Sequence, residues 1–229
     1  MNVSKPYESP ELRAVCGPAL RPGGLELTAE ALELCAFEAG AKILDLGCGA
    51  GATLKLLRDK GFEALGLDIS PVLLAEAREH GPVMEADFQR IPLDDETLDG
   101  IFCECALSLA PDKDKVLAES FRVLKAGGRL VLSDLVLKTD RLAGDLKKPG
   151  GANCLNGAES PAALAARLQR AGFHIETELD HSRALKELAA RLLWSFGSID
   201  ALKKLWGAEA VCGPAAKALG YMTFIALKK

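Results

Sequence analysis

The chain has 229 residues, of which 49% are hydrophobic and 26% charged, and its formal net charge at pH 7 is −4. This length is enough for one well-buried domain over residues 1–229 and short for two. A net negative charge argues against a surface that neutralises phosphates, so we expect a small-molecule partner and no nucleic acid. No apolar run is long enough to span a bilayer, so we expect no membrane partner.

The N-terminus and the cysteines bear on the compartment. The first eight residues lack the apolar core of a secretory signal, which predicts a cytoplasmic protein. The seven cysteines would then lie in a reducing compartment, where thiols act as small apolar groups, metal ligands or nucleophiles. Their number is odd and their spacings match no structural zinc pattern, so we expect neither a disulfide scaffold nor a zinc centre.

The first elements are expected as follows. Residues 1–24 are rich in proline and glycine and predict an irregular lead-in, which together with a first helix occupies residues 1–40. Thr28 is a candidate N-cap for that helix, over residues 29–37. Residues 42–46 are apolar on both faces, as expected of a parallel strand covered by helices.

Strands and helices then alternate. We expect strands at 63–67, 83–85, 100–104 and 128–132, and helices at 71–80 and 112–124. This alternation predicts a doubly wound, mostly parallel α/β sheet with helices on both faces and ligands at the carboxyl ends of the strands.

The last third of the chain is less regular. A helix begins at Ser160-Pro161 and is stopped by Gly172, and a strand follows near 173–178. A helical segment at 184–206 and an apolar strand at 221–227 complete the chain. Because segment 184–206 lies between two strands of the sheet, it is a candidate lid over the site.

The most informative stretch is residues 43–51, an apolar strand that ends in Asp45 and continues into a turn built on Gly47, Gly49 and Gly51. Glycine is needed where the backbone takes positive φ or approaches a ligand, and the next helix offers free N–H groups to a cofactor. Cys48 lies inside this turn, where only a small side chain fits. The turn therefore predicts a site for a nucleotide-type cofactor.

Two cofactor classes fit the turn. Gly47, Gly49 and Ala52 match the dinucleotide pattern, and Asp68 ends the second strand at a spacing suited to ribose hydroxyls, as in a nicotinamide oxidoreductase. Asp45 would repel a pyrophosphate, whereas it suits a cofactor with a cationic amino-acid end. This placement favours the second class.

Residues 43–51 resemble the first motif of class I S-adenosylmethionine (SAM)-dependent methyltransferases, and the resemblance extends over residues 40–135. Residues 91–108 are similar to the family's fourth-strand region, where an acidic turn leads into a strand that ends under the methyl donor. Residues 125–132 resemble the next turn and strand. The resemblance implies SAM as cofactor and a Rossmann-like sheet of seven strands, with the last strand inserted antiparallel at the sheet edge.

The resemblance also implies roles for individual residues. Asp68 would accept hydrogen bonds from the ribose hydroxyls, unless it is only an N-cap beside Pro71, and Ile69 would face the adenine. Asp87 resembles the position that accepts the adenine amino group, with a solvated loop carboxylate as the alternative. The complete predicted SAM-binding set is Asp45, Gly47, Cys48, Gly49, Gly51, Asp68, Ile69, Asp87, Phe88, Glu104 and Cys105.

Several cysteines are candidates for acceptor chemistry. The segment Cys154-Leu155-Asn156-Gly157-Ala158 looks like the Cys-x-x-Gly-Ala segment of arsenite methyltransferases, where a thiol binds trivalent arsenic. Cys16 and Cys212 lie roughly where that family keeps two further arsenic-binding thiols, although both precede Gly-Pro, as turn residues do. Three thiolates suit a soft trivalent centre. Cys154 and Glu104 are the predicted catalytic residues, whereas Cys103 and Cys105 share one strand face and are expected to be buried apolar residues.

The sequence thus predicts a methyltransferase that acts on a small molecule, with soft thiol or arsenic-type nucleophiles among the acceptors. Methyl transfer is an in-line displacement, so the protein must align the nucleophile with the methyl group and exclude water. One alternative is an O, N or C nucleophile of a small metabolite as acceptor. Another is a SAM-binding protein without turnover, which the absence of an obvious base would suit.

Overall fold

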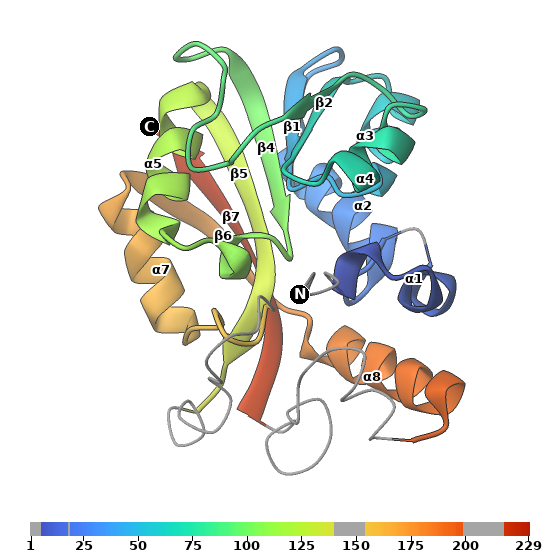
Figure 1. Cartoon of the computed structure of the whole chain (residues 1–229). Helices are drawn as coiled ribbons and strands as arrows, with labels where there is room; N and C mark the ends of the chain where they lie inside the picture. The colour runs from blue at the N-terminus through green and yellow to red at the C-terminus, as the bar shows by residue number, and fades with distance from the viewer. Residues whose placement is uncertain (1–5, 18, 140–153, 199–217) are drawn as a thin grey trace.

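A computed structural model describes residues 6–17, 19–139, 154–198 and 218–229 (Figure 1). Its centre is a seven-stranded sheet with the order β3-β2-β1-β4-β5-β7-β6. All pairs from β3 to β5 are parallel, whereas β7 runs antiparallel to both of its neighbours. The strands are β1 Lys42–Leu46, β2 Glu63–Asp68, β3 Val83–Glu85, β4 Leu98–Glu104, β5 Leu124–Leu137, β6 Phe173–Asp180 and β7 Leu219–Lys228.

Helices cover both faces of the sheet (Figure 1). The α-helices are α1 Pro10–Cys16, α2 Gly24–Cys35, α3 Ala52–Asp59, α4 Pro71–Ala77, α5 Lys113–Val123, α7 Pro161–Arg170 and α8 Ser182–Phe196, and the 3-10 helices are η1 Pro6–Glu8 and η2 Leu107–Leu109. Buried side chains of α5 and α7 belong to one core cluster and those of α2 and α3 to another. The predicted doubly wound α/β fold with an antiparallel last strand is confirmed.

The two core clusters fix the direction in which the site residues point. Leu44 and Ile101 belong to the cluster with α5 and α7, whereas Ile43 and Phe102 belong to the cluster with α2 and α3. Side chains alternate between the two faces along a strand. Asp45, at the end of β1, and Glu104, at the end of β4, therefore project on the same side as α2 and α3.

Two expectations for the N-terminal part were wrong. The supposed irregular lead-in contains α1, which Ser9 caps by accepting a hydrogen bond from the Leu12 N–H at 3.3 Å. Serine followed by proline and an acid is a helix-start signature, so this helix had a local signal in the sequence. Thr28 is not an N-cap, because α2 begins at Gly24 and leaves Thr28 completely buried inside the helix.

The place of the last strand also differs from the expectation. β7 is not at the sheet edge but between β5 and β6, and β6 is the outer strand. Exposed and half-buried residues alternate along β6, whereas eight of the ten residues of β7 are buried. The sequence shows the same contrast between the two strands, because β6 alternates polar with apolar residues and β7 is almost continuously apolar.

Part of the predicted 184–206 segment is helical as expected. Helix α8 ends at Phe196, and residues 199–206 lie outside the described residues. α8 packs against α1 through a buried cluster of Leu12, Cys16, Leu188 and Leu192. Within the described part of the chain, every helix is too short or too polar to cross a membrane.

The central strand β4 allows a test of the packing that supports the site. A Cβ at Gly100 would lie 2.5 Å from the Phe37 Cζ atom. We therefore expect Gly100→Ala to lower the free energy of unfolding by about 1–3 kcal/mol through overpacking. Urea unfolding measures this loss. In a Phe37→Leu background the same change should cost clearly less, because the two positions are in contact, and an equal loss in both backgrounds would contradict the packing.

Candidate active site

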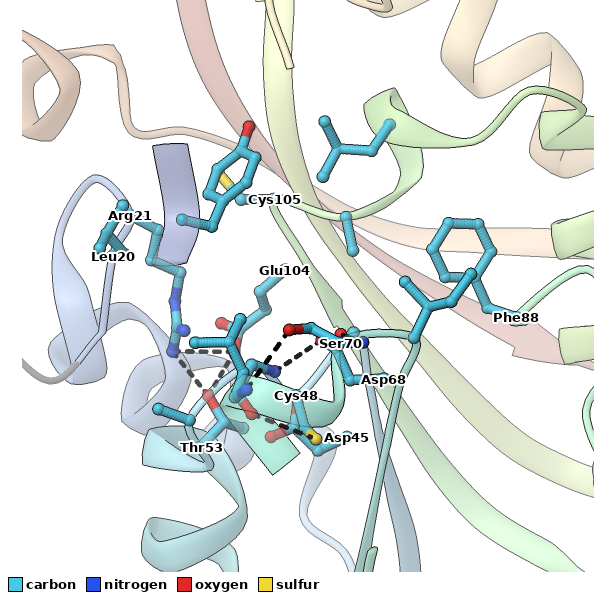
Figure 2. Close-up of a pocket in the computed structure, with 18 of the residues that line it drawn as sticks. Leu20, Arg21, Asp45, Cys48, Thr53, Asp68, Ser70, Phe88, Glu104 and Cys105 are labelled. Atoms are coloured by element: carbon cyan, nitrogen blue, oxygen red, sulfur yellow. Dashed lines mark hydrogen bonds and ion pairs between the residues drawn. The ribbon is translucent and has the colours of Figure 1, made fainter. Parts of the chain in front are cut away.

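A cavity of about 420 Å³ lies at the carboxyl ends of β1, β2 and β4 (Figure 2). Parallel sheets bind ligands at this end, and the volume is within the range of small-molecule sites. The N-terminal segment and the loop after β3 form further walls. The lining residues used below are Tyr7, Leu20, Arg21, Asp45, Gly47, Cys48, Gly49, Thr53, Asp68, Ile69, Asp87, Phe88, Glu104 and Cys105.

The glycine turn between β1 and α3 has a backbone geometry that disfavours residues with a side chain. Gly47 and Gly49 have φ of 81° and 52°, and a Cβ at Gly47 would lie 2.6 Å from the Ala106 Cβ. The N–H groups of Gly47 and Cys48 both donate to the Leu67 carbonyl of β2, which ties the turn to the neighbouring strand. The turn therefore brings bare backbone to the cavity wall.

Asp68 connects this turn to the next helix. One carboxylate oxygen accepts a hydrogen bond from the Gly49 N–H at 2.9 Å, and the other accepts one from the Ser70 N–H at 2.8 Å. Each oxygen keeps a free lone pair for a ligand donor. Ser70 rather than Asp68 is the N-cap of α4, because the Ser70 hydroxyl accepts from the Leu73 N–H. The N-cap alternative for Asp68 was therefore wrong.

The side chains that follow β2 and β3 lie at the same cavity. Ile69 is 58% exposed and lines the cavity, so its apolar side chain is available to a ligand there. The exposed Asp87 accepts a hydrogen bond from the Gln89 N–H at 2.8 Å, and Phe88 is half-buried beside it. In the view of Figure 2, Phe88 stands across the drawn residues from Arg21, which marks two ends of the cavity.

Asp45 is almost completely buried on the cavity floor. It accepts a hydrogen bond from the Leu54 N–H at 3.0 Å. Burial raises the pKa of Asp45 to about 8, and the nearby Glu104 carboxylate adds to the increase. Without a ligand, the Asp45 carboxyl is therefore mostly neutral at pH 7.

Glu104 is held in a buried polar network with the N-terminal segment. The Arg21 Nη2 atom lies 2.9 Å from a Glu104 oxygen, and Thr53 donates to the same carboxylate at 2.9 Å (Figure 2). Thr28 also donates to this carboxylate, at 2.9 Å. Burial alone would lower the pKa of Arg21, but Glu104 and other nearby acids keep that pKa above its usual value. Both oxygens of Glu104 are thus occupied by protein donors.

The predicted SAM-binding residues are brought together, with two qualifications. Gly51 does not line the cavity, since a Cβ there would lie 3.0 Å from Ala77 of α4, so its role is packing. Cys48 lines the cavity but is 93% buried, in a cluster with Leu74 and Ala77. Its thiol also lies 2.8 Å from the position of a Cβ at Gly66.

The predicted thiols are not brought together in the described residues. Cys154 is buried in the cluster of Leu135 and Tyr221, whereas Cys16 is in the α1–α8 cluster and lines neither this cavity nor the smaller one beside it. Cys212 lies outside the described residues. No group of three or more His, Cys, Asp or Glu side chains in the described part could hold a metal ion.

Cys105 differs from the expectation of a buried strand residue. β4 ends at Glu104, and Cys105 follows it with a φ of 56°, half-buried at the cavity wall. Cys103 is buried in the core as expected. The two cysteines therefore do not share a strand face.

Sequence reasoning missed Tyr7, Arg21, Thr28 and Thr53. Arg21 stands in a Pro-Gly-rich stretch that gives no hint of burial, and only its contact with Glu104, 83 positions later, explains it. Thr53 follows the glycine turn directly, so its position did carry a signal. The position of Tyr7 carried no such signal, because its hydroxyl accepts a hydrogen bond at 3.2 Å from the N–H of Cys154, which is far away in the sequence.

Comparisons with known proteins agree with this geometry. A family model described as a methyltransferase domain matches residues 44–132. The arsenite methyltransferase of Halobacterium salinarum is 30% identical over 60% of this chain, which spans only 38% of that protein. The ubiquinone biosynthesis O-methyltransferase of Xanthomonas oryzae pv. oryzae is 30% identical over 69% of this chain and 71% of its own length.

Solved structures share the fold. The cyclase SpnF superimposes with a TM-score of 0.77 at 23% identity, covering 97% of this chain and 93% of its own. A phosphoethanolamine N-methyltransferase 2 of Haemonchus contortus, solved with S-adenosyl-L-methionine, gives a TM-score of 0.78 at 18% identity over 95% of this chain and 56% of its own. The matches favour the methyltransferase interpretation of the glycine turn over the dinucleotide one, and the chain belongs to the class I SAM-dependent methyltransferase family.

Proposed function

We propose that this chain binds SAM in the 420 Å³ cavity and transfers its methyl group to a small-molecule acceptor. The observation that carries the proposal is the glycine turn joined to Asp68, which presents backbone and a carboxylate with free lone pairs to one cavity. The fit of the cofactor rests on this chain's own geometry. Positive-φ glycines, an exposed Ile69 and acids along the cavity all suit a nucleoside with a cationic end.

The lining residues would bind the nucleoside part of the cofactor at one end of the cavity and its amino-acid part at the other. Asp68 would hold the ribose hydroxyls, with Ile69 and Phe88 against the adenine and Asp87 at its amino group. Asp45 would face the cationic amino-acid end, because Glu104 is already neutralised by Arg21. We therefore propose Glu104 as a positioning residue of the floor rather than a group that moves a proton.

The bound cofactor supplies an electrophilic methyl group, so the protein's task is alignment and water exclusion. Burial raises the pKa of Tyr7 and Cys105 well above their usual values, so neither is a base at neutral pH. The acceptor must then carry an available lone pair or ionise on its own. This favours soft nucleophiles, although the relatives include an O-methyltransferase, and O, N and C nucleophiles of small metabolites stay the alternative.

The arsenic-binding trio gains little support. Burial raises the pKa of Cys154 to about 12, which disfavours the thiolate that binds a soft centre, and Cys16 belongs to a different cluster. We retain Cys154 as a residue beside the acceptor space and leave Cys16 and Cys212 out of the proposed site.

A SAM-binding protein without turnover is the second candidate. It is favoured because Tyr7 and Cys105 keep their protons and the carboxylates of the cavity are assigned to the cofactor or to Arg21, and the cyclase SpnF indicates that this fold also serves other chemistry. Incubation with SAM and candidate acceptors, followed by quantification of S-adenosylhomocysteine, distinguishes the two. We expect acceptor-dependent product above the rate without acceptor, and its absence with every acceptor class would favour the silent binder.

The role of Asp68 can be measured by isothermal titration. We expect SAM to bind and NAD to give no heat, and Asp68→Asn to weaken SAM about ten- to hundredfold through loss of charge-assisted hydrogen bonds. Asp59→Asn is the matched control, because Asp59 is an exposed acid paired only with Lys55 on α3. Thermal unfolding of both variants separates lost binding from lost folding. Tight NAD binding without SAM heat would refute the proposal.

The raised pKa of Asp45 predicts that the stability of the protein depends on pH. Its pKa is higher in the folded state, about 8, than the ordinary 3.8, so the folded protein binds this proton more tightly. The Asp45 contribution to stability should therefore fall as pH rises from about 4 to about 8. Asp45→Asn, which preserves the shape and the acceptor for Leu54, should remove this slope in urea unfolding curves.

The same residue couples SAM binding to a proton. A cationic cofactor favours ionised Asp45, so binding below pH 8 should release a proton and tighten as pH rises. Titrations in two buffers of different ionisation enthalpy measure that release. Asp45→Asn should abolish it and weaken SAM about tenfold. Unchanged proton release in Asp45→Asn would contradict this role.

A further inference from the structure

A second, smaller chamber of about 80 Å³ adjoins the cofactor cavity. The two spaces share Tyr7, Leu20 and Cys105 as lining residues, so the chamber begins where the cofactor cavity ends beyond β4. None of the residues proposed to hold SAM, except Cys105, lines it. The lining residues are Tyr7, Leu20, Pro22, Cys105, Leu135, Cys154, Leu155, Leu185, Lys186, Leu188, Ala189, Leu192 and Leu219.

The chamber wall is apolar and its polar atoms are engaged. Leucines reach it from the N-terminal segment, β5, the loop before α7, α8 and β7. The Tyr7 hydroxyl accepts from the Cys154 N–H, and the Cys105 thiol donates to the Tyr221 hydroxyl at 3.7 Å. Among the described lining residues, only Lys186 has a permanent charge, and it is an exposed residue of α8.

Apart from Lys186, the described part of the wall stays uncharged at neutral pH. Burial raises the pKa of Cys154 to about 12 and that of Cys105 and Tyr7 well above their usual values, so these groups keep their protons. A cationic ligand group in this chamber would lose its hydration without gaining a partner, because the described lining residues include no acid. An apolar ligand group would gain from leaving water.

We propose that this chamber binds the short alkyl end of the methyl acceptor, and that the acceptor is a small alkyl thiol whose sulfur lies at the shared wall of Tyr7, Leu20 and Cys105. The inference rests on the proposed methyl transfer and adds its substrate class. A volume of about 80 Å³ is roughly half of the ~150 Å³ cavity that binds benzene, which limits the alkyl end to about three to five carbons.

The choice of sulfur follows from the shared wall, where Tyr7 and Cys105 are the titratable groups and neither can take a proton from the acceptor. An alkyl thiol is a far stronger acid than an alcohol and its sulfur is a softer nucleophile, so it needs less help from the protein to attack a methyl group. The acceptor thiol releases its proton to solvent and its sulfur forms a bond to the methyl carbon. The bond from that carbon to the donor sulfur breaks with the electron pair, so the products are a methyl thioether and neutral S-adenosylhomocysteine.

Matched small molecules test the proposal on the unmodified protein. In calorimetry on protein saturated with S-adenosylhomocysteine, 1-butanethiol should bind at least about tenfold more tightly than cysteamine, a thiol of similar length with an ammonium end. From ethanethiol to 1-butanethiol, affinity should rise about fourfold per methylene, and it should stop rising at 1-hexanethiol. Equal or tighter binding of cysteamine would overturn the proposal.

Turnover tests the nucleophile. With SAM, 1-butanethiol should yield S-adenosylhomocysteine and butyl methyl sulfide, whereas 1-butanol should yield neither. No product from 1-butanethiol, or equal product from 1-butanol, would overturn the thiol assignment. A protein that gives no heat with SAM at all would instead refute the proposed function, so the two failures are distinguishable.

Two variants test whether the thiol binds in the chamber. Ala189→Phe should fill it and raise the KM for 1-butanethiol at least about tenfold without changing the Kd for SAM. Ala190→Phe, on the next and exposed residue of α8, is the matched control and should leave both constants unchanged. Leu185→Ala should enlarge the chamber and shift the preferred chain toward 1-hexanethiol. An unchanged chain-length preference in Leu185→Ala together with an unchanged KM in Ala189→Phe would overturn the location.

Discussion

The buried ion pair of Arg21 with Glu104 is the constraint on which the rest of the site depends. It joins the N-terminal segment to the end of the central strand β4, and both side chains are at most 10% exposed. Removing one partner of a buried ion pair leaves an uncompensated charge and lowers the free energy of unfolding by about 3–5 kcal/mol. Separating Arg21 from Glu104 is therefore unfavourable. The N-terminal segment is thereby held over the cavity. The partly buried Arg13–Glu76 pair also connects this segment, through α1, to α4.

This pair also makes the two carboxyl groups of the cavity floor, Glu104 and Asp45, electrostatically different. Glu104 is neutralised by Arg21 and by two threonine hydroxyls, so it is a fixed part of the wall. Asp45 accepts a hydrogen bond from the Leu54 N–H, and burial together with the Glu104 charge raises its pKa more than the nearby Arg21 lowers it. A cationic ligand beside Asp45 would favour its ionised form. Asp45 is thus the titratable carboxyl group of the floor, and it lies one residue before the end of β1 and two before the glycine turn.

Local patterns predicted most of the parallel half of the fold. The strand 42–46, the glycine turn and Asp68 are adjacent in sequence, and their geometry follows from short-range rules of strand, turn and helix start. The burial of Arg21 and the approach of Tyr7 to Cys154 depend on contacts across most of the chain, which no local pattern encodes. The order of β6 and β7 has a local signal, because the alternation of polar and apolar residues in β6 is typical of an outer strand.

Cys105 shows why the cofactor cavity and the apolar chamber are distinct. It has a φ of 56°, a conformation that costs a non-glycine residue about 1–2 kcal/mol, and its N–H donates to the Ser133 carbonyl at 2.7 Å. A glycine would adopt this conformation without strain but would leave no side chain between the two spaces. The thiol forms part of both walls and contacts the Tyr221 hydroxyl. Strain of this kind persists where the surrounding structure enforces it, and here it places a small, neutral side chain between the cofactor cavity with its acids and a largely apolar chamber.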